Sequence, residues 1–218
     1  MRTIYSYIVY IILLLQLNSC NNEGLMYEYE HSTPIKFSSS CINVSTKSQG
    51  IIENNKLPKG SNISIFSIQH PENTTINLWE PILFDNIKGI SNFNGDIEYN
   101  NTYYFPDKEQ LDFFAIYPFL SFPTIGSDYG NTQYTTVTLK DNTVDQYDLM
   151  YASLLNQSKK SSVLVFEFHH LLTQITINII KNTGVTIDLP LTKVQIVAPQ
   201  SATLDIWHGQ LSDIAGQT

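Results

Sequence analysis

The chain contains the stretch Leu111-Asp112-Phe113-Phe114-Ala115-Ile116-Tyr117, which is apolar at nearly every position and is followed by Pro118. A short apolar run that stops at a proline is typical of a strand with both faces covered. Proline lacks the backbone N–H that a hydrogen-bonded ladder needs, so it ends the run. The stretch therefore predicts a central strand of a β-sheet.

Shorter runs of β-branched and aromatic residues recur on both sides of this strand, with turn-forming residues between them. Segment 62–68 begins by alternating isoleucine with asparagine and serine, which is the pattern of a half-buried strand. The other strand candidates are 35–37 continuing toward 42–44, 79–84, 103–105, 133–139, 148–152, 163–168, 175–179, 194–197 and 204–209. Many short strands with frequent turns and no helical pattern predict an all-β fold, namely an antiparallel β-sandwich.

The first residues form a separate signal. A single positive charge at Arg2 precedes an almost unbroken apolar run, residues 4–17, which is too short for a comfortable membrane span. The run ends in Leu17-Asn18-Ser19-Cys20, the pattern of a lipobox, whose cysteine carries a diacylglyceryl thioether in bacterial lipoproteins. We therefore predict a cleaved signal peptide over residues 1–19 and lipidation of Cys20. An ordinary signal peptide with an incidental cysteine is the alternative.

The composition of the chain favours sheets and excludes one class of partner. Of the 218 residues, 42% are hydrophobic and 15% are charged, and 13 are tyrosines. The formal net charge is -8 and the single arginine, Arg2, lies in the leader, so we expect no nucleic-acid partner. Residues 20–32 lack apolar periodicity and are interpreted as a tether, and residues 33–205 as the β-domain.

Of the two cysteines, Cys20 is expected to carry lipid, which leaves Cys41 without a disulfide partner. Cys41 is interpreted as a small buried apolar residue rather than a nucleophile. Packing alone must therefore hold the domain together.

Five features in a fixed order resemble the fimbrillin-like lipoproteins of Bacteroidetes, which form or anchor surface pili. They are the lipobox at Cys20, the early strand Ile35-Lys36-Phe37-Ser38, the stretch 111–118, the segment Asp148-Leu149-Met150-Tyr151-Ala152, and the run Phe166-Glu167-Phe168-His169-His170-Leu171-Leu172-Thr173-Gln174-Ile175. The resemblance covers roughly residues 30–205. It implies β-sandwich domains of transthyretin-like topology and no active site or cofactor.

The resemblance also implies assembly by strand exchange. In this family a trypsin-like protease removes an N-terminal strand, and a strand of another subunit fills the groove through main-chain hydrogen bonds and side-chain pockets. The corresponding strand here lies between residues 35 and 44, and Lys47 is the only basic residue close behind it. Family precursors are cut after arginine, which this region lacks. The residues expected to fill pockets are Ile35, Phe37, Ile42 and Val44.

The chain departs from the family in length. Residues 206–218 are expected to be the start of a second domain that is truncated or missing. Either the chain is a fragment, or it is a subunit that does not donate a strand in the usual way, and the sequence leaves both readings open.

Two groups of residues raise the possibility of chemistry. His169 and His170 are adjacent, but neighbouring strand residues point to opposite faces, so no metal site is expected there. The carboxylates of Asp107, Glu109 and Asp112 resemble a glycosidase pair, but acidic residues near a turn are usually solvated. We therefore expect no enzymatic activity.

Trp79 and Trp207 could stack on sugars, although such rings are more often core residues of a sandwich. The leading hypothesis is a structural or adhesive pilus component and outer-membrane lipoprotein at the cell surface. Its expected partners are the membrane, through Cys20, other pilus subunits, through strand addition, and host or glycan ligands. A surface glycan-binding lipoprotein is the alternative, and an exported hydrolase is a third hypothesis.

Overall fold

The computed structural model describes residues 33–41, 55–76, 78–80, 82–120, 133–140, 147–159, 163–173 and 192–215, with residues 175, 177–180, 184 and 190. The predicted signal peptide, the tether, and residues 42–50 lie outside this part of the chain. Among the described residues there is no helix long and apolar enough to cross a membrane.

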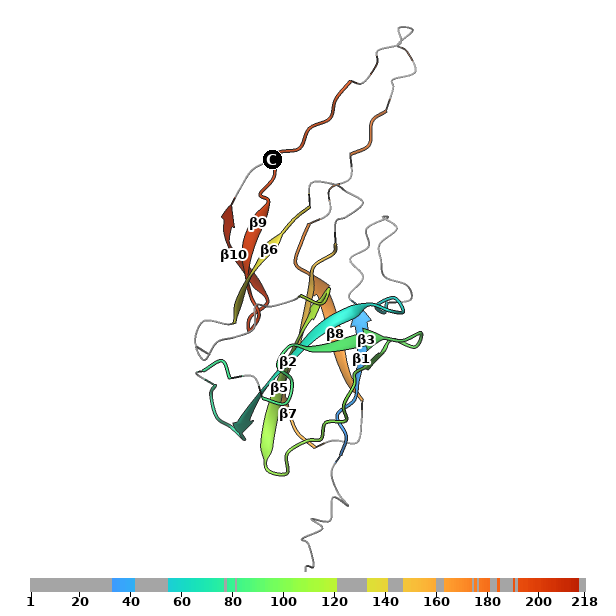
Figure 1. Ribbon diagram of the computed structural model, residues 1–218. Coiled ribbons are helices and arrows are strands. Elements are labelled where there is room, and N and C mark those ends of the chain that lie inside the picture. The colour runs from blue at the N-terminus through green and yellow to red at the C-terminus, as the bar shows by residue number, and fades with distance from the viewer. Residues whose placement is uncertain are drawn as a thin grey trace, which may run out of the picture. The chain divides into compact units, whose positions relative to one another are not determined.

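The described chain is built from strands. They are β1 (Phe37–Cys41), β2 (Asn62–Pro71), β3 (Ile87–Ser91), β4 (Asp96–Glu98), β5 (Glu109–Tyr117), β6 (Tyr134–Thr138), β7 (Met150–Gln157), β8 (Leu164–His170), β9 (Ser201–Asp205) and β10 (Gln210–Ala215). Seven of them form a closed, barrel-like sheet in the order β1-β4-β3-β2-β5-β7-β8, and β10-β9-β6 form a second sheet (Figure 1). The strand pairs are antiparallel except for β1 and β8, which run parallel.

The prediction of a central strand at 111–117 is confirmed. Strand β5 pairs with β2 along one edge and with β7 along the other, and residues 111–116 are all buried. Its alternate side chains enter two different cores: Phe113 points into the barrel, while Phe114 belongs to the second cluster. The strand is apolar at nearly every position because neither of its faces meets water.

The two cores are distinct. The barrel core contains Ile35, Phe37, Cys41, Leu57, Ile63, Ile65, Phe84, Ile97, Phe105, Leu111, Phe113, Ala115, Met150, Ala152, Leu164, Phe166 and Phe168. The second core joins outward-facing barrel residues to the three-stranded sheet and contains Phe66, Ile68, Trp79, Phe114, Ile116, Val137, Leu149, Tyr151, Leu204 and Ile206. Closure of the large sheet is what separates the two apolar sets.

The all-β prediction is confirmed, but the strands do not clearly form the expected antiparallel sandwich of transthyretin-like topology. Seven strands close into one barrel-like sheet, because β1 fits between β4 and β8 and pairs with β8 in parallel. Closure removes the free edges that an open sheet would leave. Composition and periodicity predict strands, but they do not predict which strands from distant parts of the chain become neighbours.

Several strand candidates need correction. The described residues of 79–84 lie outside any strand. The backbone N–H of Ile82 donates to the Ser67 carbonyl, and that of Phe84 donates to the Ser67 side chain. The described residues of 175–179, and segment 194–197, are extended and exposed but lie outside any strand. Segment 103–105 contributes only an isolated bridge between Tyr104 and Pro34 among the described residues. Segment 204–209 ends β9, turns, and leads into β10, which pairs back on β9.

Candidate functional site

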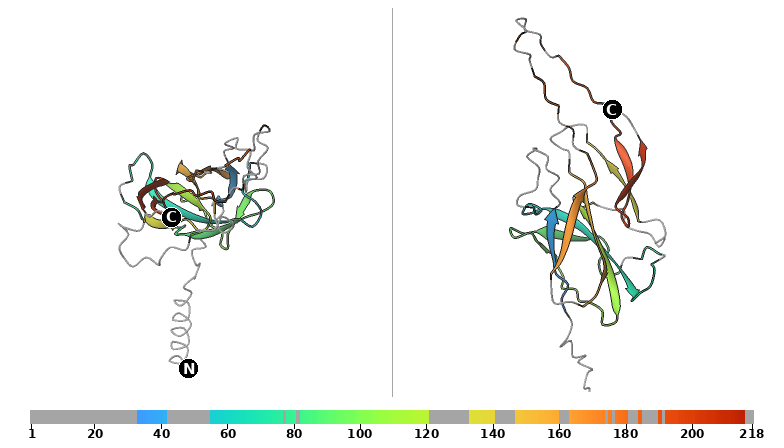
Figure 2. Two further views of the ribbon diagram at one scale, coloured as in Figure 1. Left: turned by 90° about the horizontal axis from the view of Figure 1, so that it is seen from above. Right: turned by 180° about the vertical axis from the view of Figure 1, so that it is seen from behind.

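Strand β1, which contains part of the segment singled out from the sequence, closes the barrel. It pairs with β8 over five residues, from Phe37 opposite Leu164 to Cys41 opposite Phe168, and with β4 over two. Figure 2 shows β1 and β8 side by side in the view from behind. The two strands come from segments more than a hundred residues apart, so this pairing joins the beginning of the described chain to its later half.

The inner face of β1 fills the barrel. Phe37 is 1% exposed, and its ring centroid lies 4.8 Å from that of Phe166 and 4.9 Å from that of Phe113. Ile35 and Cys41, on the same face, are also buried in the barrel core. Burial of each large apolar side chain contributes about 1.5–3 kcal/mol. The strand therefore fills part of the barrel interior with its side chains and also forms part of the barrel wall.

A small polar residue, Ser39, is buried midway along β1. Its backbone N–H donates to the Gly95 carbonyl at 2.8 Å, and its Oγ donates to the same carbonyl at 3.0 Å. Its Oγ also accepts a hydrogen bond of 3.4 Å from the backbone N–H of Leu57. Ser39 is buried beside these backbone groups. Ser39 therefore links β1 to the backbone at Leu57 and Gly95.

Both edges of β1 are hydrogen-bonded. On one side the Leu164 N–H donates to the Lys36 carbonyl at 2.8 Å, and on the other the Ile35 N–H donates to the Tyr103 carbonyl at 2.9 Å. At the far end the Cys41 N–H donates to the Asn55 carbonyl at 2.8 Å. Loss of β1 would leave unpaired groups on both flanking strands.

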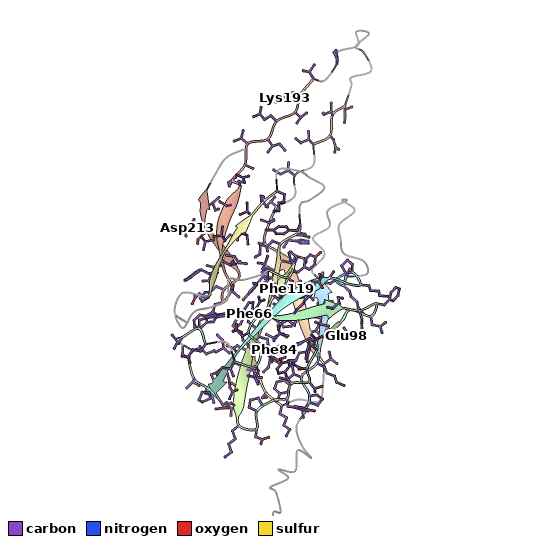
Figure 3. The ribbon with its side chains drawn as sticks, in the orientation of Figure 1. Phe66, Phe84, Glu98, Phe119, Lys193 and Asp213 are labelled. Carbon is purple, nitrogen blue, oxygen red and sulfur yellow. The ribbon has the colours of Figure 1, made fainter. Side chains whose placement is uncertain are left out.

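A hollow of about 480 Å³ runs beside β1 and β4. Its lining includes Lys36, which directly precedes β1, and two carboxylates of β4, Asp96 and Glu98. Glu98 is labelled in Figure 3. The Asn92 side-chain amide donates to Glu98 at 3.0 Å and to Asp96 at 3.4 Å, which positions both carboxylates. The rim of the β1 site is therefore acidic on its β4 side.

Burial makes Cys41 a probe of this site. Desolvation, with a smaller contribution from Asp148, raises the pKa of the Cys41 thiol to about 11. Because the reactive form is the thiolate, the thiol is protonated and inert at neutral pH, and it gains thiolate only as the pH approaches 11. The interpretation of Cys41 as a buried apolar residue is confirmed.

We expect a thiol reagent at about pH 8 to label Cys41 at least ~10-fold more slowly in the folded protein than in urea, since folding removes both access and thiolate. The Cys20→Ala background leaves Cys41 as the only thiol. Equal rates in the two conditions would contradict the buried position of β1.

The three carboxylates from which a glycosidase pair could be formed each have a different partner. Asp107 is exposed and lies 3.5 Å from a lysine ammonium, and Glu109 accepts a hydrogen bond from a glutamine of β2. The expectation of a solvated group is wrong for Asp112, which is buried. Asp112 lies 3.2 Å from Nε2 of His70 and accepts a 2.6 Å hydrogen bond from the N–H of Asn156. Its role is to hold β5, β2 and β7 together.

The adjacent histidines point in different directions. The His169 ring lies edge-on to Tyr151, with centroids 5.5 Å apart, and His170 Nδ1 lies 2.8 Å from the carboxylate of Asp148. Within the described ranges no group of three or more histidine, cysteine or acidic side chains could hold a metal ion. The pair therefore serves the junction of β7 and β8.

The two tryptophans lie in or beside the second core. Trp79 is 1% exposed and packs on Phe66 and Phe114, with centroids 5.7 and 5.6 Å apart. Trp207 is half-buried and lies 6.1 Å from Trp79. The core interpretation of Trp79 is confirmed, and this ring is not available to stack on a sugar.

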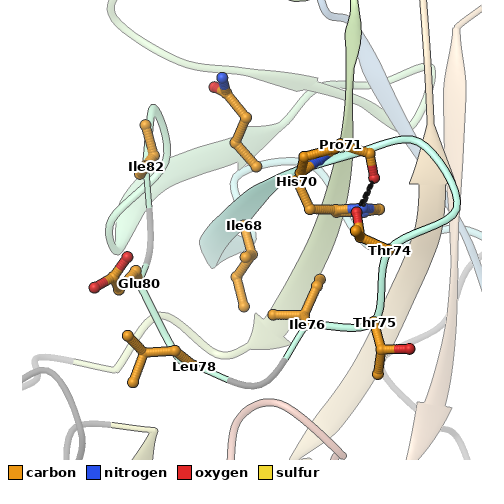
Figure 4. Close-up of a pocket in the computed structure, with 10 residues that line it drawn as sticks. Ile68, His70, Pro71, Thr74, Thr75, Ile76, Leu78, Glu80 and Ile82 are labelled. Atoms are coloured by element: carbon orange, nitrogen blue, oxygen red, sulfur yellow. Dashed lines mark hydrogen bonds between the residues drawn. The ribbon is translucent and has the colours of Figure 1, made fainter.

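A second, smaller hollow of about 270 Å³ lies along the end of β2 (Figure 4). Its lining includes Ile68, Ile76 and Leu78, together with the acidic Glu80. The imidazole of His70 at its edge is engaged by the Pro71 carbonyl at 3.0 Å as well as by the buried aspartate of β5. The surface is shallow and mainly apolar.

The structure places only part of the predicted site. Phe37 on β1 and Ile35, two residues before the strand, are buried in the barrel core. Ile42, Val44, Lys47 and Cys20 lie outside the described residues. Sequence reasoning missed the other wall of the site, formed by Leu164, Phe166 and Phe168 of β8. Their alternation is visible in the sequence, but their parallel pairing with β1 is not.

Comparisons with known proteins agree with this architecture. A family model described as fimbrillin-like matches residues 46–218. The crystal structure of a candidate cell adhesion protein from Bacteroides ovatus ATCC 8483 is similar, with a TM-score of 0.52 and 15% identity over 86% of this chain and 69% of that one. A candidate cell adhesion protein from Bacteroides uniformis ATCC 8492 has a TM-score of 0.51 and 20% identity over the same shares. At these identities the likeness concerns the fold. No curated protein matches the sequence.

Proposed function

The chain belongs to the fimbrillin-like family, and from this membership we propose that it is a pilus component whose strand β1 is exchanged for a strand of another subunit. The family is a structural one rather than an enzyme family. Membership implies a location at the cell surface and association with other pilus subunits.

The observation that carries the proposal is the position of β1 as the closing strand of the barrel. Its removal would break the pairing with β4 and β8 and open a slot between them. The slot would be lined by Phe113 and Phe166, which contact Phe37 in the intact barrel. An open apolar slot with unpaired edges is unfavourable in water, so another strand with suitable side chains would be bound in its place.

We also propose that Cys20 carries lipid that anchors the chain to the outer membrane, and that a trypsin-like protease releases the subunit after Lys47. Lys47 lies in the sequence between β1 and the next described residue, Asn55. A cut there would leave β2 to β10 on one fragment and β1 on the lipid-bound fragment. Noncovalent contacts alone would then hold β1 in the barrel.

The test is expression in a Bacteroidetes host, surface digestion with a trypsin-like protease, and analysis on unboiled denaturing gels. We expect a ladder of detergent-resistant oligomers with a new N-terminus at Ser48, because strand-exchanged subunits separate only when unfolded. The Lys47→Gln variant should stay uncut, and the Cys20→Ala variant should lose its lipid. A single unprocessed, lipid-bound band in the parent would contradict the proposal.

A further inference from the structure

The hairpin that joins β3 to β4 presents an aromatic side chain to the solvent. Phe93, near the tip of this hairpin, is 87% exposed. Burying such a ring against another apolar surface is favourable, and aromatic side chains are frequent anchors of protein interfaces. The hairpin therefore offers a contact to a partner.

Hydrogen bonds hold this hairpin in one conformation. The Asn92 side-chain oxygen accepts from the Asn94 N–H at 2.9 Å, and the Asn92 carbonyl accepts from the Gly95 N–H at 3.1 Å. Nζ of Lys56 donates to the Asn94 carbonyl at 2.7 Å. The Lys56 stem packs so closely on Gly95 that a Cβ there would lie 2.7 Å from its Cδ. Because the backbone is fixed before a partner arrives, burial of Phe93 costs little further ordering.

The hollow at the end of β2 has the size and the lining to hold such a ring (Figure 4). Its volume is about 270 Å³, whereas an apolar cavity of about 150 Å³ is enough to bind benzene. Ile68 and Ile76 lie on one side of it, and Leu78 and Ile82 on the other. Leu78 is 50% exposed and Ile82 is 46% exposed, so a bound ring would remove apolar surface of both from water.

The ring and the hollow of one chain lie at opposite ends of β2 (Figure 1). Asn62, where β2 begins, pairs with Ile90 at the base of the hairpin, whereas the last residues of β2 line the hollow. The strand is ten residues long, so at about 3.3 Å per residue its ends are about 30 Å apart. Phe93 therefore does not reach the hollow of its own chain, and a second copy must supply the hollow that it enters.

Charge favours the same contact. Lys56, which is exposed and hydrogen-bonded to the hairpin, lies beside the ring, and Glu80, which is also exposed, is part of the lining of the hollow. Asp96 and Glu98 lie near the hairpin as well, but the Asn92 amide donates to both of them. The attraction between Lys56 and Glu80 is modest because both meet water, but it favours the orientation that brings them together.

We propose that Phe93 of one copy inserts into the hollow lined by Ile68, Ile76 and Leu78 of a second copy, with Lys56 of the first copy facing Glu80 of the second. The contact is head-to-tail, because ring and hollow occupy different parts of the surface, and it can repeat from copy to copy. It leaves β1 in its barrel and goes beyond the proposed exchange of that strand. One ring and one charge pair make a small contact, so the dissociation constant should be on the order of 0.1–1 mM.

The test uses the exported chain, without the predicted leader, carrying Cys20→Ala and Lys47→Gln so that it is neither lipidated nor cut at the proposed positions. We expect its weight-average sedimentation coefficient to rise with concentration between ~0.01 and ~1 mM. Phe93→Ala removes the ring and Leu78→Asp places a charge in the hollow, so each should weaken association at least ~10-fold. The matched control, Ile214→Ala, also truncates an exposed apolar side chain and should change association less than ~2-fold.

Mixing two variants distinguishes a head-to-tail contact from a symmetric one. The Phe93→Ala variant keeps the hollow and the Leu78→Asp variant keeps the ring, so their mixture should form one-to-one pairs that do not grow further. Lys56→Glu and Glu80→Lys should each weaken association, and combining them in one chain should restore it. Both charged positions are exposed, and circular dichroism checks that every variant is folded.

Three results would each overturn the inference: a parent that stays monomeric up to ~1 mM, a Phe93→Ala variant that associates as tightly as the parent, or a mixture that forms no pairs. The proposed exchange of β1 would be unaffected by any of them, because it is tested by the oligomers that appear after cleavage at Lys47. Conversely, a chain that associates through Phe93 but forms no resistant ladder after cleavage would support this contact and contradict the exchange.

Discussion

Replacing Phe37 with alanine should lower the free energy of unfolding by about 3–5 kcal/mol, the range for removing a fully buried phenylalanine. The ring lies within 5 Å, centroid to centroid, of both Phe113 and Phe166 and is 1% exposed. These neighbours belong to β5 and β8, which cannot close over the cavity without breaking the pairing of β1. Urea unfolding followed by circular dichroism gives the value.

The matched control is Lys36→Ala, one residue earlier in the chain and exposed. It should change the free energy of unfolding by less than about 0.5 kcal/mol, because surface substitutions away from special features are nearly neutral. If Phe37→Ala and Lys36→Ala have similarly small effects on the free energy of unfolding, the side chains of β1 do not fill the barrel interior. The site proposed here would then have no apolar slot to fill.

The Gly209→Ala variant should lose about 2–5 kcal/mol of stability, through a combination of backbone strain and overpacking. Gly209 lies in the turn between β9 and β10 with φ of 63°, a conformation that L side chains rarely adopt. A Cβ at this position would overlap the ring of Tyr151. That ring is buried, and its hydroxyl donates a 2.7 Å hydrogen bond to the Trp207 carbonyl, so it cannot move aside. Thermal and urea unfolding both measure the loss.

The Gly60→Ala variant distinguishes backbone strain from overpacking as the cause of the lost stability. Gly60 also has a positive φ, of 84°, but a Cβ there would meet nothing within 4 Å. Its substitution should cost only the conformational part, about 1–2 kcal/mol. If Gly60→Ala and Gly209→Ala are equally destabilising, the turn between β9 and β10 does not pack on the barrel through Tyr151.

The polar partners of the barrel show where sequence reasoning loses information. Asp112 was expected to be solvated, because a carboxylate in a short apolar run gives no sign of where its partners lie. In the fold it accepts a hydrogen bond from Asn156 and contacts His70, and both partners lie more than forty residues away in the chain. Likewise, Trp79 is of a residue type that can stack on sugars, but its side chain is buried like that of a core residue.

In two exposed segments, by contrast, the sequence predicts strands that the described residues do not form. Segments 175–179 and 194–197 have the alternation of strands, and the sequence therefore predicts strands there. The described residues of both segments are extended but lie outside any strand.

By itself the sequence determined that the described chain is all-β, that 111–117 is its central strand, and that Phe37 belongs to a strand at its beginning. These features follow from local periodicity, composition and the placement of prolines, which act over a few residues. Only the tertiary structure decided that β1 lies parallel to β8, that seven strands close on themselves, and that Ser39 hydrogen-bonds to the Gly95 carbonyl. The reason is physical: periodicity specifies which face of a strand is buried, whereas its neighbours are chosen by how distant side chains fill a shared interior.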